Sequence, residues 1–462
     1  MATVLERPRY DRSIVEGPLQ PAVWKIAWPT MLTNVVGGLQ GIVDHVMVGH
    51  LVGFTGNAAI GVSWQIILVV IVFISSLFSG MSVLVSRFAG AGDHEKVDRT
   101  VYQAFLTATF LSFGVMAPLG YLASPWLLDF VNAAPAVRAE ALPFLRIMFV
   151  FIGGMMMFFM LGAALRSAGD ARTPMILGIA MTVLNLAFNV ILIRGLGPIP
   201  QFGTKGSAMG TAMASGLVAV YSLWKLWSGA WVVRFPRGQG FGPDWRIIRS
   251  LFRFGLPTGI QGIAMNVGGV FMLAFIGSLP QSAAAQAAFA ISYTQLFSLI
   301  TWTSVGLMGA AAAVAGQNLG AGRPDRAEKA VWTAALYNIV FLGAVGVLFL
   351  VAAPFITGLF TTDPLVQPYA IGCLRIVSLG FLFYAYGMVL TSAFNGAGDT
   401  WTPTYINLFV FWVFEIPLAW FLATRAGFGA RGVFISLTVS YSALAVVSAL
   451  LFRRGKWKTR KV

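Results

Sequence analysis

Two acidic side chains lie within long apolar stretches of the chain, where a charge is costly. Of the 16 Asp and Glu residues, only Asp44 and Glu415 fall well inside such stretches. An Asp at the centre of a membrane helix costs about 2.5 to 3.5 kcal/mol on insertion scales. Burial also disfavours the charged form of a carboxylate, which brings its proton exchange toward physiological pH. Both residues are therefore candidates for binding a proton or a cation.

Each acid also has a structural interpretation. Asp44 is alternatively a hydrogen-bonded structural acid near the outer membrane interface. Glu415 precedes Ile416-Pro417, and a proline frees a backbone carbonyl one turn earlier, so Glu415 alternatively supports a helix kink. For Glu415 the two interpretations are equally open.

Amide side chains accompany Asp44 in the first half of the chain. Asn34 and Gln40 precede it, and Asn185 and Asn189 lie four residues apart on a later segment. That spacing places the last two on one helix face. They could coordinate an ion, but hydrogen bonding between helices, at roughly 0.6 to 2 kcal/mol each, is equally compatible with the pattern.

Other site chemistries are not supported. His45 and His50 adjoin the acid, but a single nearby carboxylate does not complete a transition-metal site. The single cysteine, Cys373, excludes an internal disulfide framework and a multi-thiolate metal site. Neither Gly-x-x-x-x-Gly-Lys-Ser/Thr nor His-Glu-x-x-His occurs, so the sequence supports neither an ATP-driven pump nor that kind of zinc protease. We expect no enzyme and no cofactor, only a coupling ion, H⁺ or Na⁺.

The elements that would position these groups are membrane helices. Apolar residues make up 58 % of the chain and charged residues 10 %, against about 45 to 50 % and about 25 % in soluble domains. The mean hydropathy is +0.79. Apolar runs such as 66–85 and 331–355 are about 20 residues or longer, enough to cross a bilayer as a helix. Alternating β-barrel segments are not seen, so we expect helical spans.

An internal repeat organises these spans. Segments 165–174 and 394–403 share Gly-Asp-x-x-Thr-Pro, and their aspartates, Asp170 and Asp399, are 399 − 170 = 229 positions apart. Similar offsets relate Pro29 to Pro257, 145–147 to 374–376, and 90–92 to 320–322. A duplicated unit of roughly 230 residues is indicated.

The repeat and the six apolar runs in each half predict the fold class. We expect an all-α integral membrane protein of twelve transmembrane helices, in two six-helix lobes related by a parallel pseudo-two-fold repeat. The expected domains are an N-lobe at 1–234, a cytoplasmic linker at 235–250, a C-lobe at 251–452 and a basic cytoplasmic tail at 453–462.

Two local predictions concern helix starts. The repeated motif is interpreted as a cytoplasmic helix start rather than a substrate site, with glycines ending one helix and Thr173 or Thr402 capping the next. A further helix is expected to begin with Asp325 as its N-cap and Glu328 three residues on.

The repeat also separates fold from chemistry. At the same offsets, Asp44 is matched by Met272, and Glu415 by Leu186. Neither acid therefore has an acidic partner in the other half, and the halves are expected to be alike in fold but not in chemistry.

The basic residues predict the orientation. Most of the 31 Lys and Arg residues, which give a net charge of +15, fall on the side that holds both termini, as expected of cytoplasmic loops. The basic tail then fits the anionic inner leaflet better than a nucleic acid. The first 20 residues resemble no cleaved signal peptide. We expect a multi-pass protein of the cell inner (plasma) membrane with cytoplasmic termini, a monomer whose partners are the lipid bilayer and a small-molecule substrate, with no nucleic acid.

Taken in order, these features resemble the multidrug and toxic compound extrusion (MATE) transporters over essentially the whole chain. They are Pro29 fifteen residues before Asp44, the Gly-Ala-Gly at 90–92, both Gly-Asp-x-x-Thr-Pro copies and the twelve spans. The resemblance implies two lobes around a central cavity. It also implies export of amphipathic, often cationic, drugs or toxic metabolites by rocking alternating access, in exchange for H⁺ or Na⁺.

The resemblance assigns roles to several residues. It implies that Asp44 is the coupling acid, that Pro29 is where the first helix bends, and that Asn185 and Thr211 ring the acid. Asn189 stands where some members carry a second Asp, so any cation would meet one carboxylate rather than two.

The departures from the family favour protons over sodium at Asp44. Sodium-coupled members carry a Glu on the seventh helix and an Asp on the tenth, at places that Met265 and Tyr384 hold here. Sodium at Asp44 remains the alternative. The remaining candidates for a cavity or ion site are Asn34, Gln40, Glu415 and Tyr384.

A flippase for a lipid-linked precursor is the alternative function. Such a protein would need charged residues in its cavity to hold phosphate, and few basic residues lie within the spans here.

Overall fold

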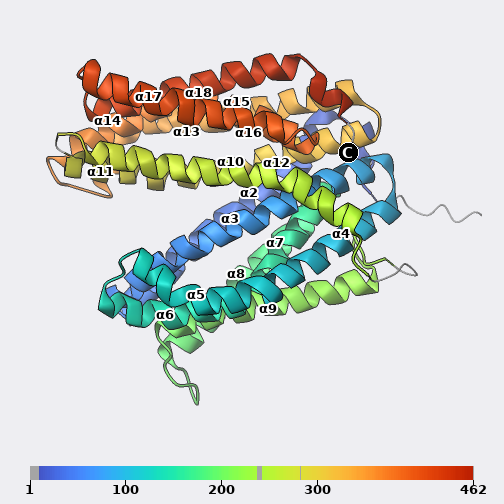
Figure 1. The fold of residues 1–462 in the computed structure, drawn as a ribbon, viewed down its shortest axis with the longest axis horizontal. Helices are drawn as coiled ribbons and strands as arrows, with labels where there is room; N and C mark the ends of the chain where they lie inside the picture. Colours follow the sequence, from blue (N-terminus) through green and yellow to red (C-terminus); the bar gives the residue numbers. More distant parts are fainter. Residues whose placement is uncertain (1–9, 237–241, 281, 461) are drawn as a thin grey trace, which may run out of the picture. The chain divides into compact units, whose positions relative to one another are not determined.

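The computed structural model describes residues 10–236, 242–280, 282–460 and 462. Residues 237–241 of the expected linker lie outside this part of the chain. Throughout the described ranges the chain forms helices joined by turns, and no strand occurs in them (Figure 1).

Packing contacts divide the protein into two units. The first comprises Met1–Asp11 and Leu32–Gly259, and the second Arg12–Met31 and Ile260–Val462. Two long helices contribute to both: α2 (Leu19–Leu51) changes unit after Met31, and α10 (Trp245–Gly277) after Gly259. Each change comes two residues after an internal proline, Pro29 or Pro257. The domain boundaries expected from the sequence stay a prediction. The structure shows in addition that the first part of α2 packs with the second unit and the first part of α10 with the first unit.

The first unit contains the helices from α3 to α9. They are α3 (Phe54–Ala91), α4 (His94–Thr109), the π-helix η1 (Phe110–Met116), α5 (Ala117–Phe130), α6 (Pro135–Val150), α7 (Ile152–Ser167), α8 (Arg172–Arg194) and α9 (Thr204–Ser228). Within this unit α8 packs along α9, and α3 packs against α6 and α7.

The second unit contains the short α1 (Ser13–Glu16) and the helices after α10. They are α11 (Ser282–Phe289), the π-helix η2 (Ala290–Phe297), α12 (Ser298–Gly320), α13 (Pro324–Gly358), α14 (Val366–Leu379), α15 (Phe381–Gly396), α16 (Trp401–Leu408), the π-helix η3 (Phe409–Phe414), α17 (Glu415–Trp420), the π-helix η4 (Phe421–Arg425), α18 (Ala430–Arg453) and the 3₁₀-helix η5 (Lys456–Thr459). Here α12, α13, α15 and α18 lie together (Figure 1).

The helices account for twelve membrane spans. Among the described residues, eight spans are long and apolar enough to cross a membrane, and two bent pairs, α6–α7 at 53° and α14–α15 at 51°, bring the number to ten. The two remaining long helices, α2 and α9, have 33 and 25 residues. They are less apolar because they carry polar side chains, among them Asp44 and Thr211. The two bends fall at Phe151 and Gly380, which repeats the offset (380 − 151 = 229).

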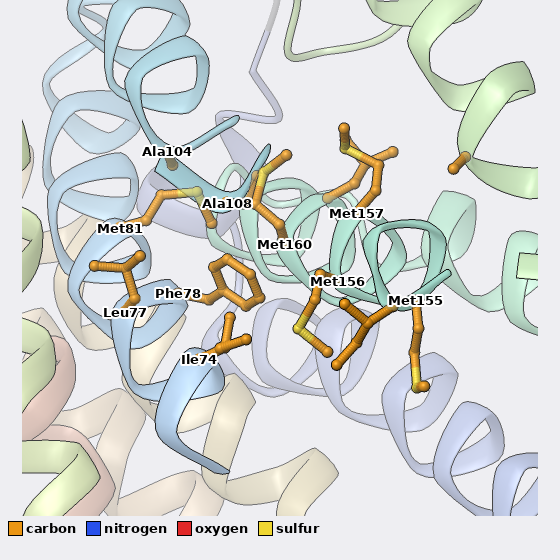
Figure 2. Packing of buried hydrophobic residues seen from close by; sticks show 14 of the residues in the cluster. Ile74, Leu77, Phe78, Met81, Ala104, Ala108, Met155, Met156, Met157 and Met160 are labelled. Atoms are coloured by element: carbon orange, nitrogen blue, oxygen red, sulfur yellow. The ribbon is translucent and has the colours of Figure 1, made fainter. Parts of the chain in front are cut away.

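The core of the first unit forms where α3, α4 and α7 meet. Ile74, Leu77, Phe78 and Met81 recur on α3 at the spacing of one helix face. Figure 2 shows Ile74, Phe78 and Met81 on the side of the methionines of α7 and of Ala104 and Ala108 on α4, while Leu77 points the other way. Methionine is unbranched and fills irregular gaps between helices, and alanine lets α4 approach closely.

The repeated motif does start a helix, but in its first copy the aspartate, and not the threonine, bonds the free backbone N–H groups. Asp170 Oδ1 accepts hydrogen bonds from the backbone N–H groups of Arg172 and Thr173, at 3.1 and 3.0 Å. In the second copy, Thr402 Oγ1 donates to Asp399 Oδ2 at 2.8 Å. The prediction that the threonines cap these helices was wrong, because Thr173 and Thr402 lie in the first turn of α8 and α16 and their hydroxyls donate to the aspartates.

The helix start near Asp325 is also displaced. Helix α13 begins at Pro324 with Arg323 as its N-cap, so Asp325 lies in the first turn. Proline takes the first helical position because its missing N–H has no partner there in any case.

The chain end is held on the second unit rather than extending freely. Trp457 is fully buried and stacks on Phe452 with ring centres 4.6 Å apart. Lys458 forms an ion pair with Glu328 at 2.6 Å, and this hydrogen bond raises the pKa of Lys458. Arg460 reaches Asp399 of the repeated motif at 3.2 Å.

A glycine contact inside the first unit gives a stability prediction. Gly80 of α3 lies so close to α10 that an added Cβ would collide with the carbonyl oxygen of Leu251. We expect Gly80→Ala to lower the free energy of unfolding by about 1 to 3 kcal/mol, since overpacking forces the helices apart. The readout is the thermal unfolding midpoint in detergent. Gly216→Ala, on α9 with no atom within 4 Å of the new Cβ, is the control, and equal midpoints for the two variants would contradict the prediction.

Candidate functional site

Asp44 is buried on α2 and bonded to α8. Its side chain is 5 % exposed, and Asn189 Nδ2 donates a hydrogen bond of 2.7 Å to its Oδ1. The two residues are 145 positions apart in sequence. Asp44 is therefore a partnered acid inside the first unit, held by a neutral amide rather than by a basic side chain.

The bond to Asn189 is the first of a chain of polar contacts. Asn189 Nδ2 also donates to Asn185 Oδ1 at 3.1 Å, and Asn185 Nδ2 donates to Thr211 Oγ1 at 3.0 Å. Thr211 in turn donates to the backbone oxygen of Ser207, one turn earlier on α9, at 3.1 Å. The structure thus brings four predicted residues together and links α2, α8 and α9 through them.

One acceptor in this chain is left open. Asn189 is fully buried, and its Oδ1 has no hydrogen-bond partner within the described residues. Gly210 of α9 makes room for it, because a Cβ at Gly210 would collide with Asn189 Oδ1. The site therefore offers a carboxylate and, on the amide that bonds it, an oxygen with acceptor capacity to spare. The described ranges hold no group of three or more His, Cys, Asp or Glu side chains that could bind a metal ion.

Gln40 extends the polar contacts along the same pair of helices. Thr182 Oγ1 on α8 donates to Gln40 Oε1 at 2.8 Å, one turn before Asp44 on α2. Asn34, still earlier on α2, is half-buried in the same unit. Sequence reasoning missed Thr182, although its place three residues before Asn185 puts it on the same face of the helix.

The remaining candidates lie elsewhere. His45, half-buried, pairs its Nδ1 with Asn57 Oδ1 of α3 at 2.6 Å. Glu415 and Tyr384 belong to the second unit, and Pro29 lies on the part of α2 that also belongs to it. The structure therefore does not gather them with Asp44 in the first unit.

Comparison with known proteins gives a consistent match over the chain. A family model described as MatE matches residues 29–191 and again 257–421. The chain is 25 % identical to the probable multidrug resistance protein YoeA of Bacillus subtilis, over 96 % of both proteins. It is 31 % identical to the probable multidrug resistance protein NorM of Xanthomonas campestris pv. campestris, over 93 % of both. The two family matches begin 257 − 29 = 228 residues apart, which agrees with the duplication.

Solved structures match the fold. The TM-score is 0.89 with a MOP superfamily transporter from Pyrococcus furiosus, at 21 % identity over 97 % of this chain and 98 % of that one. It is 0.87 with an outward-facing multidrug resistance MATE family transporter, at 21 % identity over 96 % and 97 %. The expected all-α fold of twelve membrane helices in two six-helix halves is confirmed.

The bond between Asp44 and Asn189 predicts energetic coupling. We expect Asp44→Ala and Asn189→Ala to be non-additive by about 0.5 to 3 kcal/mol in the free energy of unfolding, because each variant removes the same contact. Denaturant unfolding in detergent of the single and double variants measures this coupling. Asn338→Ala, in the second unit where Asn338 bonds Ser304 and Ala385, is the control partner for Asp44→Ala. Additivity of the Asp44 and Asn189 pair would contradict the contact.

Proposed function

Because the chain belongs to the MatE family of multidrug and toxic compound extrusion transporters, we propose that it exports amphipathic, often cationic, drugs or toxic metabolites as an ion-coupled antiporter. The names of the relatives as multidrug resistance proteins support this substrate class. The observation that carries the coupling is the chain from Asp44 through Asn189 and Asn185 to Thr211, which keeps one carboxylate out of water on a membrane helix.

Protons suit this site better than sodium. A proton cancels the single charge of Asp44 and leaves a neutral group that the apolar surroundings tolerate. Sodium would need several oxygen ligands, and Asn189 supplies an amide where a second carboxylate would bind the ion more strongly. In the proposed cycle Asp44 takes up a proton from outside as substrate is released there. The proton is then released to the cytoplasm, from which the next substrate molecule binds.

Helix α2 is the element suited to carry this change. Pro29 lacks an N–H and so weakens the helix locally. The helix passes from one unit to the other two residues later. A change in the charge of Asp44 can alter the bend at Pro29, and a change in that bend would act on both units, which is what rocking alternating access requires.

One exchanged proton is energetically sufficient. A unit charge that crosses 100 mV is worth about 2.3 kcal/mol, and about 1.4 kcal/mol corresponds to a factor of ten. One acid therefore supports a substrate gradient on the order of tens-fold.

The proposal includes a location. A monomer in the plasma membrane with both termini in the cytoplasm fits the distribution of the 31 basic residues. In that orientation the repeated Gly-Asp-x-x-Thr-Pro motif lies at the cytoplasmic surface.

Removing the charge of Asp44 tests the coupling role. We expect Asp44→Asn to abolish uphill export of a cationic dye from cells while the protein remains at its normal level in the membrane, since the amide cannot exchange a proton. Asp363→Asn, the same change at an exposed loop position after α13, should export as the unaltered protein does. Undiminished uphill export by Asp44→Asn would refute the mechanism.

Imposed ion gradients identify the coupling ion. In liposomes that contain the purified protein, we expect an imposed proton gradient to drive dye accumulation and an imposed sodium gradient at constant pH to have no effect. The physical reason is the single carboxylate at Asp44. Accumulation driven by sodium alone would assign Na⁺ to the site instead.

A further inference from the structure

The second half carries a counterpart of the Asn185 position, and a π-helical segment hides it in the sequence. Ahead of that segment the two halves keep the offset of the repeated motif. The buried residues Leu177 and Gly178 of α8 match the buried Ile406 and Asn407 of α16 (406 − 177 = 229).

After the π-helix η3 the offset increases by one. Asn185, Asn189 and Ile193, all buried on α8, then match Glu415, Ala419 and Ala423, all buried on α17 and η4 (415 − 185 = 230). A π-helical turn holds one more residue than an α-helical turn, which accounts for the added position.

A second contact supports the new offset. Gly206 of α9 lies against the backbone of Leu192, and Gly432 of α18 lies against the backbone of Leu422 (422 − 192 = 230). Glu415 therefore corresponds to Asn185 of the Asp44 site rather than to Leu186. The match of Glu415 with Leu186 came from a fixed offset that ignores the extra residue, whereas the prediction that Glu415 has no acidic partner in the first half is unaffected.

Glu415 lies in an aromatic, hydroxyl-rich environment within the second unit. Its side chain is 5 % exposed, while Tyr384 is 6 % and Tyr441 0 % exposed. The rings of Tyr384 and Tyr441 have centres 5.0 Å apart. Electrostatic interactions connect Glu415 to Tyr293 and Tyr441, and the Ser440 hydroxyl lies beside the carboxyl group.

Several polar atoms in this cluster are unsatisfied. Within the described residues Glu415 Oε2, the Tyr441 hydroxyl and the Ser440 hydroxyl are buried and form no hydrogen bond of good geometry. A buried carboxylate without a basic partner is unfavourable as a permanent charge, and a polar group that stays unpaired calls for an explanation.

No basic side chain pairs with Glu415 among the described contacts, and Arg431 and Arg453 of α18 are exposed near the two ends of that helix. Helix α17 packs on η3, η4 and α18. The six residues of η3 include no titratable side chain, and Arg425 of η4 stacks over Trp420 at 5.6 Å instead. The titratable groups that interact electrostatically with the carboxyl are Tyr441 of α18 and Tyr293 of η2, while Tyr384 of α15 and Cys373 of α14 interact with these tyrosines.

We propose that Glu415 is a second proton-binding site, in which the carboxylate takes up a proton to become the neutral acid. Tyrosine hydroxyls would form hydrogen bonds with both the charged and the neutral form. A phenol O–H can donate to the carboxylate, and its oxygen can accept from the carboxylic acid. Among the described residues no cluster of three or more His, Cys, Asp or Glu side chains is present that could hold a metal ion here. The consequence for transport rests on the proposed antiport, whereas proton binding itself does not.

Infrared spectroscopy of the protein in liposomes tests the binding directly. On lowering the pH from mildly alkaline to mildly acidic, we expect a carboxylic-acid C=O band that is lost in Glu415→Gln and retained in Asp44→Asn. Tyr441→Phe should shift the frequency of this band, because it removes a hydroxyl that interacts electrostatically with the carboxyl. The Phe variant keeps the ring and so guards against a failure of Glu415→Gln to fold.

Two results would overturn the proposal. A Glu415 C=O band that persists at every pH would make the residue a permanently neutral structural acid. A carboxylate band that responds to Na⁺ at constant pH, and not to pH, would make it a metal site.

Transport measurements separate this proposal from that for Asp44. If both acids carry protons, Glu415→Gln should reduce the protons moved per substrate molecule by one, whereas Asp44→Asn should abolish uphill export. Normal uphill export by Asp44→Asn, together with a titrating Glu415 band, would refute the proposed coupling and leave the second site standing. An unchanged proton ratio in Glu415→Gln would refute its part in transport.

Discussion

The hydrogen bond from Asn189 to Asp44 is the contact on which the rest of the site depends. A carboxyl group in the hydrocarbon region must be neutralised or bonded, and no basic side chain is bonded to Asp44 among the described contacts. The amide that bonds it must itself be oriented, which Asn185 and Thr211 do. Gly210 leaves the space that the amide oxygen occupies. A chain of hydrogen bonds that begins at a single acid thus connects three helices.

Much of the architecture was predictable because it follows from hydropathy and repetition. The twelve spans, the duplication and the candidate site residues Asp44, Asn185, Asn189 and Thr211 were predicted from the sequence. Thr182 and the role of Gly210 were not, because a partner such as Gln40, 142 positions from Thr182, is identified only by the folded chain. The helix caps were missed because aspartate and threonine compete for the same N–H groups, and spacing alone does not decide between them.

The π-helices limit how far a repeat can be followed in sequence. One residue gained in η3 moves the match of Glu415 from an exposed leucine to a buried amide position. Side chains on a helix change face with every residue, so an offset that is wrong by one position reverses the inference about which residues are equivalent. The local irregularity, rather than the overall duplication, decides where the second acid stands.

In both halves polar contacts join the first membrane span, α2 or α10, to the fifth, which is α8 or the run from α16 to α17. The halves differ in which of these spans carries the acid. In the first half Asp44 on α2 bonds Asn189 on α8. In the second, Gln261 on α10 donates to Thr404 on α16 at 2.9 Å, while the acid stands on α17, which continues α16. The place of Asp44 is taken by the buried Met272. Since α2 and α10 both change unit after a proline, each half makes this polar contact on a helix shared by both units, and the duplication preserved the contact without preserving the acid.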